Sequence, residues 1–229
     1  MGLGNFFRRK TDNLKDIGNE DSSGLNKKAS MVADQLDQLG YFKYADPSDI
    51  EHLKLEIAKG LVEGHYIVHV EGPAPGYKVL DPRHYILDGE DLFEQGGIVD
   101  SLKEMTPFFE KLNIKMTISG HLEEYDAENQ WLNHEITIND KKYVIFENFE
   151  GYGWGEVAQR FADMVNDQLR LQGSNERLHL IYGGNDGRAI FLTDELRDLV
   201  SRYIKDSRER PLQTEEWCRV QSVQYVEIA

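Results

Sequence analysis

Cysteine is almost absent from this sequence, which contains Cys218 and no other among its 229 residues. One thiol cannot close an intrachain disulfide, and it excludes zinc sites built from several cysteines. The sequence also has no apolar run near the roughly 20 residues of a membrane-spanning helix. A basic cluster, Arg8, Arg9 and Lys10, follows two aromatic residues without the apolar stretch of a secretory signal. We therefore expect a cytoplasmic protein in a reducing compartment.

Positive charge is scarce as well. The chain carries 26 lysine and arginine residues against 41 aspartates and glutamates, which leaves a net charge of −15 and a pI near 4.9. Phosphate groups and anionic membranes attract basic side chains, so this composition argues against both nucleic acid and membrane as partners. A hydrophobic fraction of 40% is too high for a disordered chain. The composition indicates an acidic globular protein.

The negative charge is concentrated in the middle of the chain. Residues 46–150 hold nine basic and 22 acidic side chains, a net charge of −13, whereas residues 1–28 have a net charge of +2. An acidic surface improves solubility, and a field of one sign also steers a partner of the opposite sign. We expect residues 1–28 to form a flexible basic arm. Residues 29–229 then form one α+β domain, with a possible N-terminal helical subdomain over residues 29–112.

Apolar periodicity predicts the helices and strands. Helices are expected at residues 30–39, 50–64, 98–112 with a kink or restart at Pro107, 158–169, and after Thr193 as N-cap. A three-stranded meander is expected at residues 114–123, 132–138 and 143–149, and a hairpin at 178–182 and 189–192. Short strands are expected at residues 65–70, 77–80 and 85–87, and the apolar tail at 217–228 should dock as an edge strand.

This order of elements predicts the fold class. Strands that are joined by tight turns pair antiparallel, which argues against a doubly wound nucleotide-binding sheet. We therefore predict an α+β fold, in which an antiparallel sheet made of the meander and the hairpin is packed by helices, with an N-terminal helical part.

The common catalytic motifs are missing. The glycine run 151–155 lacks the Lys-Ser/Thr ending of a phosphate-binding loop, and the run 183–187 is typical of a hairpin turn. The sequence contains neither His-Glu-x-x-His nor Gly-x-Ser-x-Gly, and no histidine is positioned to activate Cys218. We therefore predict a protein without catalytic activity, cofactor or metal.

Two histidines remain as candidates. His121 and His134 lie on strands that should pair, so their side chains could approach one another. Strict alternation opposes this, because it places His121 on the polar face and His134 on the apolar face. An enzymatic alternative stays open, namely a hydrolase or transferase that works through His121, Glu123 and Glu135.

Acidic residues surround aromatic ones in two places, which suits an interface for a basic protein, since aromatic anchors and charged rims recur at binding hot spots. The predicted partner-binding residues are Glu90, Asp91, Glu94, Glu123, Glu124, Tyr125, Asp126, Glu128 and Trp131.

About half of the chain, the run that begins with Leu92-Phe-Glu-Gln-Gly-Gly-Ile-Val and ends with Tyr182-Gly-Gly-Asn-Asp-Gly-Arg-Ala-Ile-Phe-Leu-Thr193, resembles bacterial immunity proteins of polymorphic and contact-dependent toxin systems. The resemblance implies an acidic single-domain inhibitor that binds a cognate basic toxin, such as a nuclease, and masks its active site. Besides the enzymatic alternative, a scaffold protein that docks through residues 1–28 stays open.

Overall fold

The computed structural model describes residues 19–65, 70–71 and 78–228. Its helices are α1 (Asn19–Gln38), α2 (Ile50–Glu63), α3 (Gly89–Phe93), α4 (Gly97–Lys111), α5 (Trp154–Leu171), α6 (Asp194–Tyr203) and α7 (Thr214–Gln221). Its strands are β1 (Val70–Glu71), β2 (Lys78–Val79), β3 (His84–Ile86), β4 (Ile118–Asp126), β5 (Trp131–Ile138), β6 (Lys141–Phe149), β7 (Arg177–Ile181) and β8 (Arg188–Leu192). Over the described ranges, every helix is too short or too polar to cross a bilayer.

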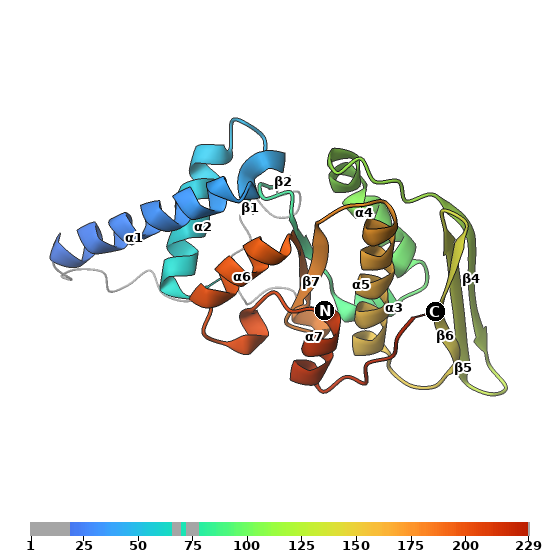
Figure 1. Cartoon of the computed structure of the whole chain (residues 1–229). Coiled ribbons are helices and arrows are strands. Elements are labelled where there is room, and N and C mark those ends of the chain that lie inside the picture. The colour runs from blue at the N-terminus through green and yellow to red at the C-terminus, as the bar shows by residue number, and fades with distance from the viewer. Residues whose placement is uncertain (1–18, 66–69, 72–77, 229) are drawn as a thin grey trace.

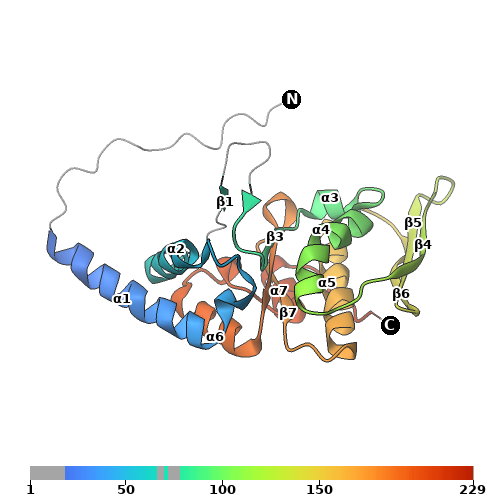
Figure 2. The ribbon, with the colours of Figure 1, turned by 90° about the horizontal axis from the view of Figure 1, so that it is seen from above.

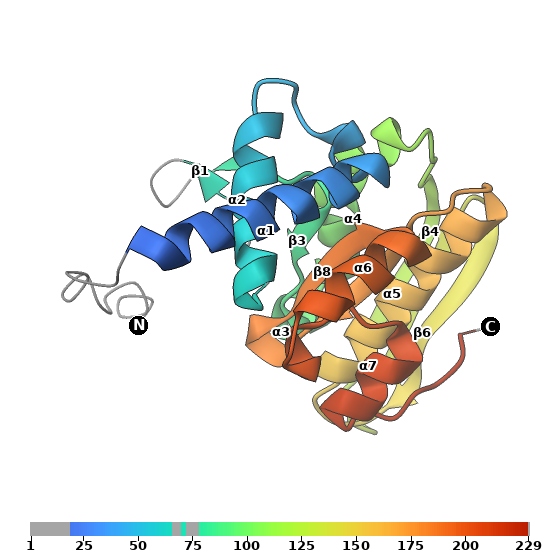
Figure 3. The ribbon, with the colours of Figure 1, turned by 60° about the vertical axis from the view of Figure 1, so that its left-hand side comes forward.

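The elements form successive layers (Figure 1). The antiparallel sheet β3–β8–β7 lies in the middle, with α1, α2 and α6 on one side and α4 and α5 on the other. The antiparallel meander β4–β5–β6 lies beyond α5, at the opposite end of the molecule from α1, and the view from above shows the same order (Figure 2). Figure 3 shows α6 beside α2, and α7 against α5.

The middle sheet is buried on both faces: every residue of β7 and β8 after the first arginine is buried, and these residues are all apolar in β8 but include His179 in β7. On one face, Leu178, Leu180, Ala189 and Phe191 join the larger core with α4, α5 and the meander. On the other face, Ile181, Ile190 and Leu192 join the second core with α1, α2 and α6. The two cores therefore share this sheet as their common wall.

The predicted α+β class is confirmed. The meander and the hairpin both form, but they belong to two separate antiparallel sheets and not to the single sheet that was predicted, and β4 begins at Ile118 instead of residue 114. Thr193 caps α6, because its hydroxyl oxygen accepts a hydrogen bond from the N–H of Leu196 at 3.4 Å. One pairing was not predicted: β3, far from the hairpin in sequence, adds to β8 as the third strand.

The first helix begins earlier than predicted. Helix α1 starts at Asn19, so residues 19–28 of the expected arm are helical, and residues 1–18 lie outside the described residues. Ala29, Val32 and Leu36 anchor the helix in the second core. Once this packed part is helical, each preceding residue gains one hydrogen bond for each residue fixed, without a new nucleation cost, which extends the helix into polar sequence. Most of the strand expected at residues 65–70 also lies outside the described residues.

The expectation for the tail was wrong, and of the two alternatives at Pro107 the restart was wrong. The tail does not form an edge strand: Thr214, Trp217 and Cys218 are buried on one side of helix α7, and their spacing of three and four residues is helical. Helix α4 does not restart at Pro107 but runs through it. Proline has no backbone N–H, so this turn lacks one backbone hydrogen bond. In the same turn, the hydroxyl of Thr106 donates a hydrogen bond to the carbonyl oxygen of Leu102 at 3.1 Å.

A fully buried arginine connects distant parts of the chain. The guanidinium of Arg83, which precedes β3, pairs with the carboxylate of Glu176 at 2.8 Å. It also donates to the carbonyl oxygens of Tyr41 at 2.7 Å and of Phe191 at 2.8 Å. One side chain therefore holds three parts of the chain together: the segment after α1, the strand β8 and the residue before β7.

The buried His179 on β7 makes stability depend on pH. Burial, together with the positive charge of Arg197, lowers the pKa of His179 from 6.5 to about 3. The unfolded chain therefore takes up the proton first, so stability is full above pH 6.5 and falls as the pH drops toward 3, by up to about 1.4 kcal/mol per pH unit. The free energy of unfolding, measured in urea between pH 7 and 5, should fall less steeply with decreasing pH in His179→Leu than in the native chain. His52 is exposed, so His52→Ala should keep the native dependence of unfolding free energy on pH. The same dependence in all three proteins would contradict this prediction.

Candidate functional site

A β-bulge in β4 decides where the predicted histidine points. Ile118 pairs with Ile138, but Gly120 pairs with Thr137, which leaves Ser119 as one extra residue in β4. An extra residue moves every later side chain to the opposite face of the strand. His121 therefore lies on the inner face, and the predicted separation of the two histidines onto opposite faces was wrong.

The bulge brings His121, Glu123 and His134 together. The Nε2 atoms of His121 and His134 lie 3.0 Å apart, and Glu123 is the direct register partner of His134. A carboxylate oxygen of Glu123 lies 3.7 Å from Nε2 of His121, and the other lies 3.9 Å from Nδ1 of His134. We call these three residues the His-Glu-His cluster.

Burial sets the electrostatics of the cluster. It lowers the pKa of His134 to about 4, with a further contribution from the neighbouring His121, so that His134 is neutral at physiological pH. The Glu123 side chain is only 9% exposed. Its carboxylate accepts a hydrogen bond at 2.9 Å from the backbone N–H of Gly96, the N-cap of α4, which fixes its orientation.

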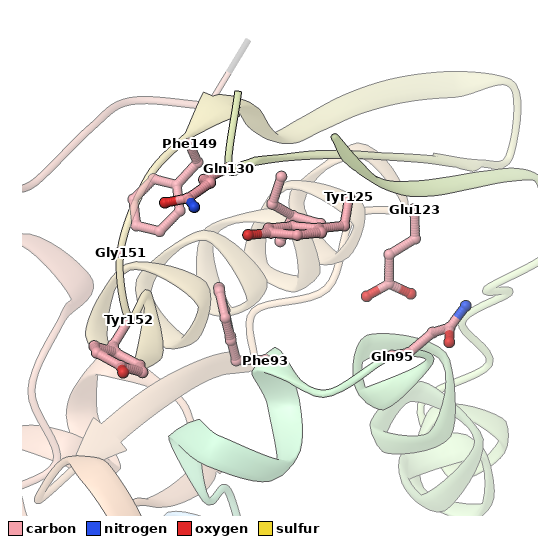
Figure 4. Close-up of a pocket in the computed structure, with 9 residues that line it drawn as sticks. Phe93, Gln95, Glu123, Tyr125, Gln130, Phe149, Gly151 and Tyr152 are labelled. Carbon is pink, nitrogen blue, oxygen red and sulfur yellow. The ribbon is translucent and has the colours of Figure 1, made fainter. Parts of the chain in front are cut away.

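An aromatic cleft opens beside the cluster (Figure 4). It has a volume of about 530 Å³, and Figure 4 shows Tyr125 and Glu123 projecting from β4 opposite Gln95. Tyr152 is 89% exposed and Tyr125 is 65% exposed, so both rings are available to a binding partner. The lining residues are Phe93, Gln95, Glu123, Tyr125, Gln130, Leu132, Phe149, Gly151 and Tyr152.

A second hollow, the acidic groove, lies on the other side of Gln95, which lines both. It has a volume of about 460 Å³ and contains five carboxylates. Burial raises the pKa of Glu104 at this site. Neither lysine nor arginine is among the described residues that line either hollow. The carboxylates of the acidic groove are those of Asp88, Asp91, Glu94, Asp100 and Glu104.

The predicted partner-binding residues fall into two groups, one at or near the two hollows and one at the β4–β5 hairpin. Asp91 and Glu94 line the acidic groove, and Glu123 and Tyr125 line the aromatic cleft. Glu90 is near them and accepts a hydrogen bond from the amide of Asn185 at 3.0 Å. The others, Glu124, Asp126, Glu128 and Trp131, lie at the β4–β5 hairpin.

At that hairpin, Asp126 has a structural role. Its carboxylate accepts hydrogen bonds from the side-chain amide of Asn129 at 2.8 Å, from the backbone N–H of Asn129 at 3.0 Å and from the indole N–H of Trp131 at 3.1 Å. These bonds hold the turn and lower the pKa of Asp126. Trp131 is half-buried and partnered, whereas Glu124 and Glu128 are exposed.

The enzymatic alternative through His121, Glu123 and Glu135 loses one member. Glu135 is the register partner of Leu122, on the outer face of the meander, and its carboxylate pairs with Lys142 at 2.7 Å. The structure brings together the other two residues with His134 instead. Three carboxylates of the acidic groove, those of Asp88, Asp100 and Glu104, were not predicted from the sequence. The signal that could have found them is the high number of acidic residues at 88–104, beside a turn and the start of a helix.

The remaining sequence candidates have structural explanations. A side chain at Gly153 would place its Cβ 2.8 Å from the ring of Phe93, so this glycine permits close packing at the start of α5. Cys218 is buried, and burial raises its pKa to about 12, which keeps the thiol protonated and unreactive.

Comparison of the whole chain with protein-family models, with curated proteins and with solved structures finds no match.

Proposed function

We propose that this chain is a non-enzymatic binding protein for a basic protein, and that it acts as an immunity protein that masks the active site of a basic toxin in the cytoplasm. The observation that carries this proposal is the acidic groove, which adjoins the aromatic cleft across Gln95. Together the two hollows combine concentrated negative charge with exposed rings.

The charge of the groove is largely uncompensated. Among the described residues, Lys103 supplies the one ion pair to it, with Asp100 at 2.8 Å on the exposed surface of α4. Asp91 and Glu94 are exposed and face solvent. Lysine and arginine side chains of a partner can therefore take the place of water around these carboxylates, and the charge field accelerates their approach.

The aromatic cleft supplies the anchor that an acidic surface lacks. Tyrosine rings bury a large area at a low cost in conformational entropy, which is why they are enriched at hot spots. Tyr125 and Tyr152 stand on opposite sides of this cleft (Figure 4). A toxin that binds phosphate groups needs a basic active site, so a surface of this kind covers it in competition with the substrate.

The test is to co-express the chain with the product of each gene that adjoins its own, and to measure growth rescue and binding. We expect one toxic neighbour to be neutralised and to bind at nanomolar concentration. The double variant Asp91→Lys/Glu94→Lys should lower the association rate at least tenfold at low salt, and added salt should shrink the difference.

The matched control is Asp34→Lys/Glu51→Lys, which changes the net charge by the same amount on the exposed surfaces of α1 and α2. It should keep most of the native association rate. Equal loss in both variants would refute the groove as the binding surface. An acidic partner, a failure to neutralise any neighbour, or a turnover that disappears in His121→Ala would refute the proposed function.

A further inference from the structure

Three metal-ligating side chains converge in the His-Glu-His cluster. One ligand atom from each of the three residues lies within 4.8 Å of the others. Two come from β4 and one from β5, and both strands belong to a packed sheet. Strands position ligands more rigidly than loops do, so the arrangement is pre-organised.

The spacing fits a tetrahedral metal ion. Zinc binds imidazole nitrogen at about 2.0–2.1 Å, which places two such nitrogens roughly 3.3 Å apart. The two Nε2 atoms of His121 and His134 are 3.0 Å apart, and the Glu123 oxygen is 3.7 Å from Nε2 of His121. The three ligand atoms all lie within 4.8 Å of one another, wider than the roughly 3.3 Å of a bound set, so the side chains must close in around the ion.

Hydrogen bonding within the cluster leaves it poorly satisfied. One imidazole donates its Nε2 proton to the Nε2 lone pair of the other, which accounts for the 3.0 Å contact. Both separations between Glu123 and the histidines, 3.7 and 3.9 Å, exceed hydrogen-bond distance. Among the described residues, the nearly buried carboxylate of Glu123 has one hydrogen-bond donor, the N–H of Gly96. A buried carboxylate with so little compensation is stabilised by a cation.

The surroundings favour a cation of the imidazole-binding class. A neutral imidazole has one ring nitrogen with a free lone pair, and the Nε2 atoms of the two imidazoles lie 3.0 Å apart in this cluster. Gly96 acts as an outer partner that orients the carboxylate, as is usual around metal ligands. Calcium and magnesium prefer oxygen ligands, whereas two imidazoles and one carboxylate form a common zinc set.

We propose that His121, Glu123 and His134 bind a divalent transition-metal ion, Zn²⁺ in the first instance, through two Nε2 atoms and one carboxylate oxygen. Glu123 also lines the aromatic cleft, so the proposed site adjoins it. The site is a property of this chain alone and does not require the proposed toxin.

The experiment is a titration of the purified chain, freed of metal by a chelator, with zinc chloride in a calorimeter, with metal analysis after gel filtration. We expect one Zn²⁺ per chain, a micromolar or tighter dissociation constant and a rise in melting temperature with added zinc. Titration with Co²⁺ should give the intense visible absorption of a tetrahedral site.

His121→Ala removes one ligand from the less buried side of the cluster, and Glu123→Gln removes the negative charge at constant size. Each should weaken zinc binding at least tenfold and abolish the cobalt spectrum, while circular dichroism stays native. The control His52→Ala removes an exposed histidine on α2 and should bind zinc like the native chain. A native chain that takes up no stoichiometric zinc, or an equal loss in His52→Ala, would overturn the proposal.

Discussion

Replacing Arg83 with methionine is expected to lower the free energy of unfolding by about 3–5 kcal/mol, because removal of one partner from a buried ion pair strands the other charge. Within the described ranges, Glu176 then keeps one ion-pair partner, Lys43 at 3.3 Å, whose side chain is half-exposed. The variant also leaves the carbonyl oxygens of Tyr41 and Phe191 without their donor. Equilibrium urea unfolding measures the loss, and both cores should unfold at a lower denaturant concentration.

The matched control for this prediction is Arg208→Met. Arg208 also pairs with a carboxylate, that of Asp206 at 2.9 Å, but its side chain is mostly exposed. Exposed ion pairs contribute about 1 kcal/mol or less. The double variant Arg83→Met/Glu176→Met removes both buried charges and should lose less stability than the two single variants combined. Similar stabilities for Arg83→Met and Arg208→Met would show that the buried pair is not structural.

Replacing Phe191 with alanine should cost a similar amount, about 3–5 kcal/mol, through the cavity it leaves. Phe191 is fully buried on β8, and its ring centroid lies 4.7 Å from that of Phe108 and 5.8 Å from that of Phe109. It also meets Tyr85 of β3 edge-on at 5.8 Å. The variant therefore loosens the contact between the middle sheet and α4, and thermal or urea unfolding detects this.

Tyr152→Ala is the control for the Phe191 variant. Tyr152 is 89% exposed in the aromatic cleft, so its loss should change stability by no more than about 0.5 kcal/mol. The pair of variants also separates folding from binding, because Tyr152 lies where the partner should contact the chain. A loss of more than 2 kcal/mol in Tyr152→Ala, or less than 1 kcal/mol in Phe191→Ala, would contradict this view of the core.

Local sequence patterns were sufficient for the α+β class, the meander, the hairpin and the cap at Thr193. These features depend on neighbours along the chain: alternation for a strand, a period near 3.6 for a helix, and a side-chain acceptor two or three residues before a free N–H. The acidic character of residues 46–150 also follows from counting alone. It indicated the region of the acidic groove, but not which carboxylates line it.

The His-Glu-His cluster and the contacts between residues remote in sequence depend on the tertiary packing of the elements. Alternation along β4 placed His121 on the wrong face, because the extra residue at Ser119 becomes visible only when β4 is paired with β5. Arg83 meets Glu176 across 93 positions of sequence, and β3 joins β8 from a comparable distance. Patterns along a chain record which side of an element is apolar, whereas register, bulges and buried ion pairs are chosen by the packing of elements that are remote in sequence.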